Sequence, residues 1–221
     1  MRAPILIRFF RVVPPVPFWM HAAFVIAVIA AGAALALRLT GPAGALPPIV
    51  LLQMLATSSG FAVPARRGHY DLLLTSGANR LHIAAAHWVA SSVGGVAAWL
   101  AVAAIEAIVA RAWPAVSLAS GTIVVFAVVS LVPWAVTVPL PRLTGGLIWL
   151  LLVVTLQAIF PAAFTHPTAS VVLVSPWVLI GARVSDLAPA VVIPVMAVTV
   201  AATVAACVWI CRVNVGLQVA R

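Results

Sequence analysis

The chain has 221 residues, of which 65% are hydrophobic and only 7% are charged, and its formal net charge is +9. Soluble globular domains carry about 25% charged residues, so this composition excludes a soluble domain, which needs more polar surface to cover its core. All twelve basic residues are arginines, scattered along the chain without a basic run. This distribution argues against nucleic-acid binding and favours a helical membrane protein with arginines at the ends of its spans.

Residues 1–15 contain the stretch PILIRFFRVVPP. On a helical wheel, Phe9 and Phe10 belong to a broad apolar face, whereas Arg8 and Arg11 lie together opposite it. We therefore expect an amphipathic helix in the cytoplasmic membrane interface. An unstructured basic tail is the alternative.

Long apolar runs then predict six membrane spans, since a spanning helix needs about 20 apolar residues. We place them at residues 17–37, 46–63, 81–109, 117–138, 147–164 and 188–211. The first run is long and ends in an arginine, so we interpret it as a span and not as a cleaved signal peptide. With both termini in the cytoplasm, nine arginines fall inside and three fall outside: Arg38, Arg111 and Arg183. This asymmetry follows the positive-inside rule and supports six spans.

The stretch ARRGHYDLLLTSGANR, residues 65–80, connects the second and third predicted spans. Gly68 and Gly77 bracket a short predicted helix, residues 69–76, in which Tyr70, Leu73 and Leu74 form one apolar face. So short a helix is not stable in water by itself. We expect this face to dock on the membrane surface or on a cytoplasmic partner protein.

Residues 161–187 are mostly apolar but are interrupted at Pro167 and Pro176. Their apolar core is too short and broken for two further spans. We predict a re-entrant or interfacial segment on the outer side, which needs shielding by protein or a water-filled cavity.

Polar residues inside the predicted spans are candidates for a substrate path. Glu106 is the one acid within a span, and an intramembrane ionisable residue is a functional candidate by default. Pairing of Glu106 with Arg111 or Arg38 is the structural alternative. Gln53 and Gln157 are weaker candidates, for which interhelical hydrogen bonding is the alternative.

Two other features of the third predicted span concern packing and metal binding. Small residues around Gly94 favour close approach of a neighbouring helix. His82 and His87 are five residues apart and so do not share a helix face that could bind a metal. We expect both histidines at the cytoplasmic interface, and we expect no metal site.

Several kinds of chemistry lack the residues that they require. The chain has no lysine, so it cannot form a Walker A phosphate-binding loop. It has three acids, Asp71, Glu106 and Asp186, with no two close in sequence, which argues against paired-carboxylate catalysis. No Gly-x-Ser-x-Gly nucleophile motif is present. We therefore predict no catalytic residues and no cofactor bound by this chain.

The segment RRGHYDLLLTSGANRLHIAAAH resembles the loop between the second and third spans of type-2 ABC exporter permeases. That loop has the form acid-x-x-Gly-Thr-Leu-(Asp/Glu)-Leu-Leu-Leu-(Thr/Ser)-(Ser/Thr)-Pro-x-(Ser/Thr)-Arg. The matching positions are Gly68, Asp71, Leu72, Leu73, Leu74, Thr75, Ser76 and Arg80. The departures are Ala65 in place of the acid, His69 in place of threonine and Gly77 in place of proline.

The resemblance implies that this loop forms a coupling helix, which would contact a separate ATPase subunit that binds ATP and Mg²⁺. The implied contacts are Arg66, Arg67, Gly68, Tyr70, Asp71, Leu73, Leu74, Thr75, Ser76 and Arg80. It further implies a single transmembrane domain over residues 1–221, paired with a second copy or a paralogous permease in a bacterial inner membrane. The substrate would be amphipathic or lipophilic. An ATP-independent transporter or channel, a membrane enzyme, and an assembly or immunity factor remain alternatives.

Overall fold

The computed structural model describes residues 9–10, 14–39, 47–58, 60–110, 130–159 and 189–212. Within these residues the protein consists of helices joined by turns, without strands, which confirms the predicted all-α class. The helices are α2 (Phe18–Ala36), α4 (Pro47–Thr57), α5 (Ala62–Arg66), α6 (Asp71–Thr75), α7 (Arg80–Ala110), α9 (Arg142–Ile159) and α12 (Pro189–Arg212). A further short helix, Ser130–Thr137, precedes α9.

Three stretches among the described residues are long and apolar enough to cross a membrane: Phe18–Ala36, Pro48–Arg66 and Arg80–Val109. A fourth candidate is the pair Ser130–Thr137 and Arg142–Trp149, which is bent by 117°. In α12, Thr199–Arg212 is apolar but shorter. The first and third stretches closely match two predicted spans, and the apolar helices support membrane association.

Other predicted boundaries differ from the structure or lie outside the part that it describes. The described part of the fifth predicted span (147–164), residues 147–159, belongs to α9, which begins earlier, at Arg142. Most of the fourth span, residues 117–138, and the whole segment 161–187 lie outside the described residues.

The second predicted span is divided into two helices. At the end of α4, the Thr57 hydroxyl donates to the Gln53 carbonyl oxygen at 2.8 Å, and the Ser58 hydroxyl donates to that of Met54 at 2.6 Å. The Ser58 amide also donates to the Met54 carbonyl oxygen at 2.9 Å, so these hydroxyls bond back to carbonyls of the last helical turn, as serine and threonine side chains do near helix ends. The chain then passes through Gly60 and enters α5.

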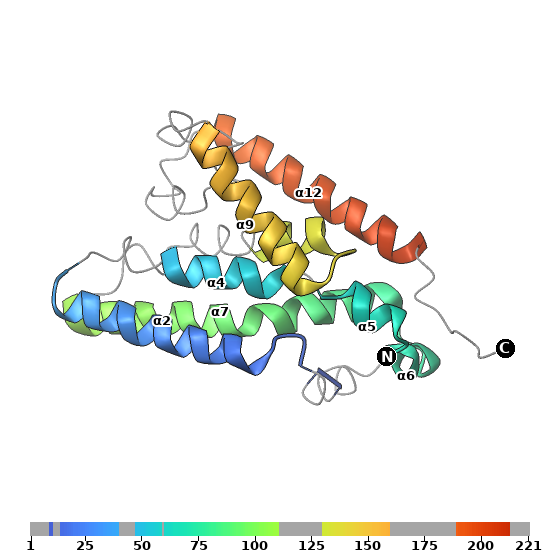
Figure 1. Ribbon diagram of the computed structural model, residues 1–221, viewed down its shortest axis with the longest axis horizontal. Helices are drawn as coiled ribbons and strands as arrows, with labels where there is room; N and C mark the ends of the chain where they lie inside the picture. Colours follow the sequence, from blue (N-terminus) through green and yellow to red (C-terminus); the bar gives the residue numbers. More distant parts are fainter. Residues whose placement is uncertain are drawn as a thin grey trace.

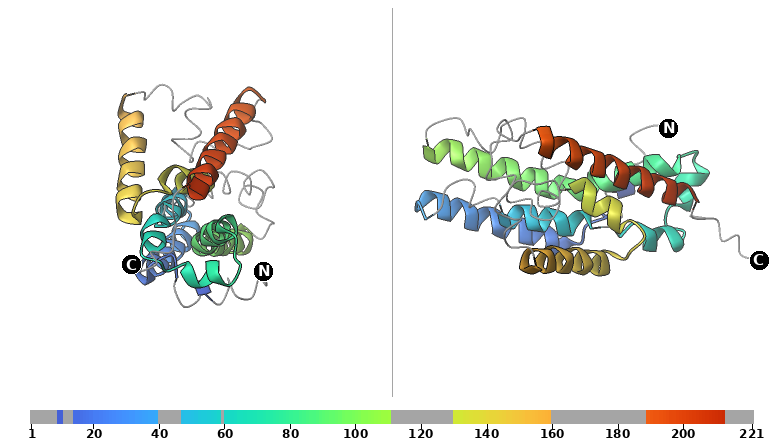
Figure 2. Two further views of the ribbon diagram at one scale, coloured as in Figure 1. Left: turned by 90° about the vertical axis from the view of Figure 1, so that its right-hand side faces the viewer. Right: turned by 90° about the horizontal axis from the view of Figure 1, so that it is seen from above.

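The longest helix, α7, organises the bundle. It contacts α2, α4 and α12, while α9 contacts α4. Helices α2, α4 and α7 lie side by side along the long axis of the molecule, and α9 and α12 run obliquely to them (Figure 1). In a view along that axis, α9 stands to one side of the other helices (Figure 2).

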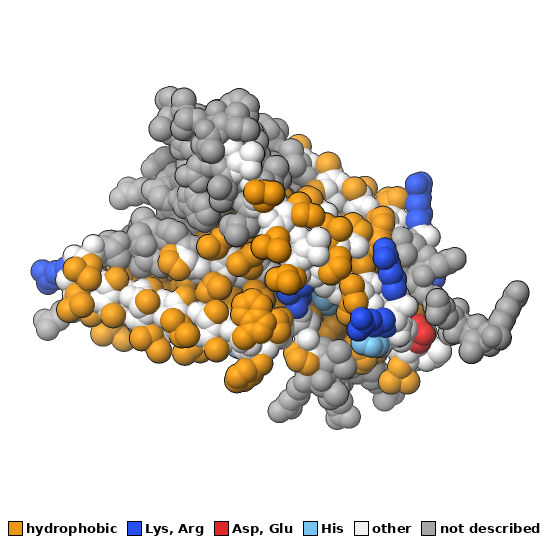
Figure 3. Space-filling model, in the orientation of Figure 1, with side chains coloured by type: hydrophobic (Ala, Val, Ile, Leu, Met, Phe, Trp, Pro, Cys, Tyr) orange, Lys and Arg blue, Asp and Glu red, His pale blue; other side chains and the backbone are white. Residues whose placement is uncertain are grey.

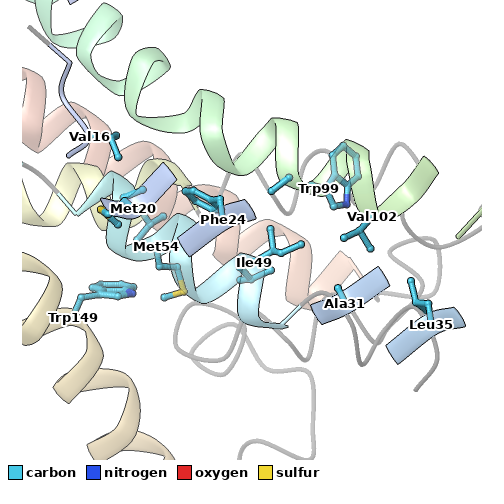
Figure 4. Packing of buried hydrophobic residues seen from close by; sticks show 14 residues of the cluster. Val16, Met20, Phe24, Ala31, Leu35, Ile49, Met54, Trp99, Val102 and Trp149 are labelled. Carbon is cyan, nitrogen blue, oxygen red and sulfur yellow. The ribbon is translucent and has the colours of Figure 1, made fainter. Parts of the chain in front are cut away.

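The main core lies between α2, α4 and α7 (Figure 4). Phe24 is buried beside Gly94, where an added Cβ would lie 3.2 Å from two carbons of the Phe24 ring. This confirms that the small residues of α7 permit close helix approach, which is how helices pack when lipid surrounds them.

Apolar side chains remain exposed along the outer faces of several helices. On α9 they include Leu143, Leu147 and Leu151, and on α12 they include Val200, Val204 and Val208. A spacing of four residues places each set on one side of its helix. In Figure 3 apolar side chains also cover the flank over α2. Soluble monomers rarely leave strips of this extent open to water, so these faces suit contact with lipid.

Basic side chains gather at the end of the molecule that carries α5 and α6 (Figure 3). We call this the basic end, defined by Arg66, Arg67, Arg80 and Arg212. Arg80 Nη1 donates to the Cys211 carbonyl oxygen at 3.3 Å, which brings the start of α7 to the end of α12. The predicted cytoplasmic positions of these arginines are therefore consistent with one another.

Candidate functional site

The loop between α5 and α7 is shaped by two similar helix endings. At the end of α5, the His69 and Gly68 amides donate to the Pro64 and Ala65 carbonyl oxygens at 3.0 and 3.2 Å. This is the hydrogen-bond pattern of a Schellman motif, in which the residue after the helix cap adopts a left-handed conformation. Gly68 supplies that conformation with a φ of 74°.

The same pattern ends α6. The Ala78 and Gly77 amides donate to the Leu73 and Leu74 carbonyl oxygens at 2.9 and 3.0 Å, and Gly77 has a φ of 85°. The two glycines that bracket the loop in the sequence therefore serve as its two turning points. Helix α6 is slightly shorter than the predicted helix, residues 69–76.

The predicted apolar face of α6 is turned into the protein. Tyr70 is 2% exposed and Leu73 is 1% exposed, whereas Leu74 is half-buried. The Tyr70 ring stacks on Phe61 with ring centroids 5.3 Å apart. Our expectation that this face docks on a membrane or a partner was wrong for Tyr70 and Leu73, because the aromatic residues of the chain itself already cover it. Burial also raises the pKa of the Tyr70 hydroxyl.

Tyr70 belongs to an aromatic cluster that joins segments distant in sequence. The Phe9 and Phe10 rings lie 5.9 and 6.3 Å from the Tyr70 ring, and the Phe61 and Phe10 rings lie 5.6 and 6.1 Å from the His87 ring. We define the aromatic cluster as Phe9, Phe10, Phe61, Tyr70, His87 and Trp134. It ties the start of the chain to the loop and to α7.

Of the predicted interfacial helix, only Phe9, Phe10 and the last two residues, 14–15, are described. Phe9 and Phe10 are helical, and Phe10 is buried against protein rather than presented to lipid. Arg8 and Arg11 lie outside the described residues.

His87 is buried within the cluster and not at the protein surface, whereas its depth at the membrane interface stays a prediction. Trp134 Nε1 donates a hydrogen bond to His87 Nδ1 at 3.4 Å. An indole nitrogen can only donate, so Nδ1 must accept and the imidazole must be neutral. His82, one turn earlier, is exposed.

The opposite side of α6 faces outward. Leu72 is 73% exposed, and His69, Thr75 and Ser76 are exposed on the same side. The Thr75 and Ser76 hydroxyls donate to the Leu72 and Leu73 carbonyl oxygens at 3.0 and 2.8 Å. Because both hydroxyls are bonded to the helix itself, Leu72 is the apolar centre of this surface.

Charged residues surround that surface. Arg66 and Arg67 are exposed at the end of α5. Asp71 lies in the first turn of α6, where the helix dipole favours an acid. Of the predicted contact residues, the structure therefore leaves Arg66, Arg67, Thr75 and Ser76 at the surface, and it adds Leu72.

The three predicted substrate-path residues do not form one site. Gln53 is fully buried in α4, and neither polar atom of its amide has a hydrogen-bond partner in the described part of the chain. Glu106 is buried near the other end of α7 from the loop. Gln157 lies in α9, and its side chain is outside the described set.

A cavity of about 600 Å³ lies beneath the aromatic cluster, and sequence reasoning missed it. Its lining includes Phe10, Trp19, Tyr70, His87, Arg142 and Leu147. We had interpreted Arg142, like the other arginines, only as a topology signal near the end of a predicted span. In the structure it projects into an apolar space between α2 and α9.

No group of three or more potential metal ligands occurs among the described residues. Neither a family model, nor a curated protein, nor a solved structure matches the chain.

Proposed function

We propose that the chain is the membrane-spanning permease subunit of an ATP-driven ABC exporter. Its loop of residues 65–80 would act as the coupling element, and a separate ATPase subunit would bind there. The observation that carries the proposal is the surface of α6: an exposed leucine on a short helix that is held between two glycine turns at the basic end.

The burial pattern refines the proposed contact. A coupling element has to transmit movement, so it needs firm attachment to the bundle on one side and a free surface on the other. Tyr70 and Leu73 provide the attachment through the aromatic cluster, and Leu72 with Thr75 provides the free surface. ATP-driven closure of the ATPases would then push on α6 and shift α7 against its neighbours, which requires two alternative arrangements of the bundle.

The remaining architecture belongs to the same proposal. It includes six spans with both termini in the cytoplasm, a re-entrant segment at residues 161–187, and a second permease copy or a paralogue. The substrate would be amphipathic or lipophilic, because the described interior has few charged groups.

The decisive experiment is co-purification from the native host in mild detergent, with mass spectrometry of the bound proteins. We expect the wild-type chain to retain a soluble protein that carries a Walker A motif. Leu72→Glu should lose it, because a charge would enter an apolar contact. Leu39→Glu is the matched control, since Leu39 is 76% exposed but lies just beyond the C-terminal end of α2, away from the loop.

Loss of the ATPase in Leu72→Glu alone would support the proposal. Retention of the ATPase by Leu72→Glu would refute the coupling assignment, and a wild-type complex without any ATPase would refute the ABC proposal.

A further inference from the structure

The cavity beneath the aromatic cluster has one charged group in its described lining, the guanidinium of Arg142. Two of its nitrogens, Nε and Nη2, are enclosed and have no hydrogen-bond partner among the described residues. Arginine keeps its charge in proteins, and buried donors of a charged group that lack partners are costly, although the side chain as a whole is partly exposed. These two donors would suit an anionic group placed in the cavity.

The chain offers few acids that could fill this role. It has three in total: Asp71, Glu106 and Asp186. Asp71 forms no ion pair with Arg142, and its Oδ1 is itself enclosed without a hydrogen-bond partner in the described part of the structure. Glu106 lies near the other end of α7, and Asp186 lies outside the described residues.

The position of Arg142 is built by close backbone packing. A Cβ added at Gly60 would lie 3.4 Å from Arg142 Cβ and 3.8 Å from its Cζ, so the break between α4 and α5 lies directly against the arginine. On the next turn, a Cβ added at Gly146 would lie 3.2 Å from Leu55 Cδ2. This packing holds the guanidinium beside the cavity with Nε and Nη2 buried, while the side chain as a whole stays partly exposed.

The cavity walls suit a hydrocarbon chain. Trp19, Leu143 and Leu147 line it and are 60%, 71% and 58% exposed, so it opens sideways between α2 and α9. Leu143 and Leu147 continue into the exposed strip of α9 through Leu151. An apolar path therefore leads from the enclosed arginine to the surface that faces lipid.

We propose that this cavity binds an anionic lipid-like amphiphile, with its phosphate or carboxylate group on Arg142 and its acyl chain along α9. Arginine pairs with such groups through two parallel hydrogen bonds, and basic pockets between membrane helices recognise anionic lipid headgroups. A volume of about 600 Å³ lies within the range of small-molecule sites. The inference does not depend on an ATPase partner.

Native mass spectrometry of the full chain tests this proposal. The purified protein is incubated with equal amounts of palmitoyl-oleoyl phosphatidylglycerol and phosphatidylcholine. We expect preferential binding of the anionic lipid, and we expect Arg142→Gln to weaken that binding about tenfold, the effect of losing one charge-assisted pair. Arg67→Gln is the control, because it removes an exposed charge at the same end of the molecule.

Two further probes separate the sources of the anion. Oleate binding that is lost in Arg142→Gln would show that a carboxylate headgroup also fits. Displacement of phosphatidylglycerol by inorganic phosphate alone would overturn the role of the acyl chain.

The remaining outcomes decide whether the site exists. Equal binding of the two phospholipids, or equal loss in the two arginine variants, would overturn the proposal, because the effect would then come from overall charge. A large gain of lipid binding in Asp186→Asn would also overturn it, since the chain would then supply its own counter-ion. Thermal unfolding of Arg142→Gln checks the fold, and we expect no loss of stability because the variant removes an unpaired enclosed charge.

Discussion

Leu72 and Leu73 are adjacent in one short helix, yet Leu72 is exposed and Leu73 is buried. The pair therefore provides a sensitive test of the loop structure. Leu73 is 1% exposed and Leu72 is 73% exposed. Because the loop lies outside the apolar spans, Leu73 is buried from water, where burial of a leucine side chain contributes about 1.5–3 kcal/mol. Truncation to alanine also leaves a cavity, and such changes cost about 2–5 kcal/mol.

We expect Leu73→Ala to lower the free energy of opening the loop by about 2–3 kcal/mol, toward the lower end of that range because a short loop can partly collapse. Amide hydrogen exchange measures this opening directly. The Ala78 amide, which donates to the Leu73 carbonyl oxygen, should exchange roughly 30 to 140 times faster. Leu72→Ala should change the exchange rate little, since surface substitutions usually stay within about 0.5 kcal/mol.

Equal effects of the two substitutions would refute this reasoning, because they would show that α6 is not seated on the aromatic cluster. A large effect of Leu72→Ala alone would show that the helix is rotated, with the opposite face inward.

Three further predictions concern the stability of the purified protein, measured as thermal unfolding in detergent. Gly68→Ala should destabilise the loop by about 1–3 kcal/mol, because the residue has a left-handed conformation and an added Cβ meets Asp71 Oδ2 at 2.7 Å. Gly77→Ala should cost less, because open space surrounds the Cβ added there. Equal losses in the two variants would contradict the contact between the added Cβ and Asp71. Arg38→Gly should stabilise the end of α2 by about 1 kcal/mol, because Arg38 has a φ of 55°, and an unchanged melting temperature would argue against that conformation. Gln53→Met should be neutral or stabilising by roughly 1 kcal/mol, because the buried amide has no partner in the described structure. A marked loss of stability in Gln53→Met would instead indicate that the amide has a partner.

Local features of the sequence were enough to predict several parts of the structure. Phe18–Ala36 and Arg80–Ala110 are continuous apolar helices whose extent follows from composition alone. Gly68 and Gly77 were identified as helix breakers because few other residues adopt a left-handed conformation at low cost. Membrane association follows from the same chemistry, since a chain with 7% charged residues cannot cover its core with polar surface.

Only the tertiary structure showed which residues pack against each helix face. Helical periodicity placed Tyr70 and Leu73 together, but it could not show that Phe61 covers them, because Phe61 lies in another segment. For the same reason the sequence could not show that His87 is buried and accepts a hydrogen bond from Trp134. Arg142 was interpreted as a topology signal like the other arginines, yet it lines a cavity and packs against Gly60. Sequence patterns determine which residues share one face of a helix. Which other segment packs against that face depends on contacts between distant parts of the chain.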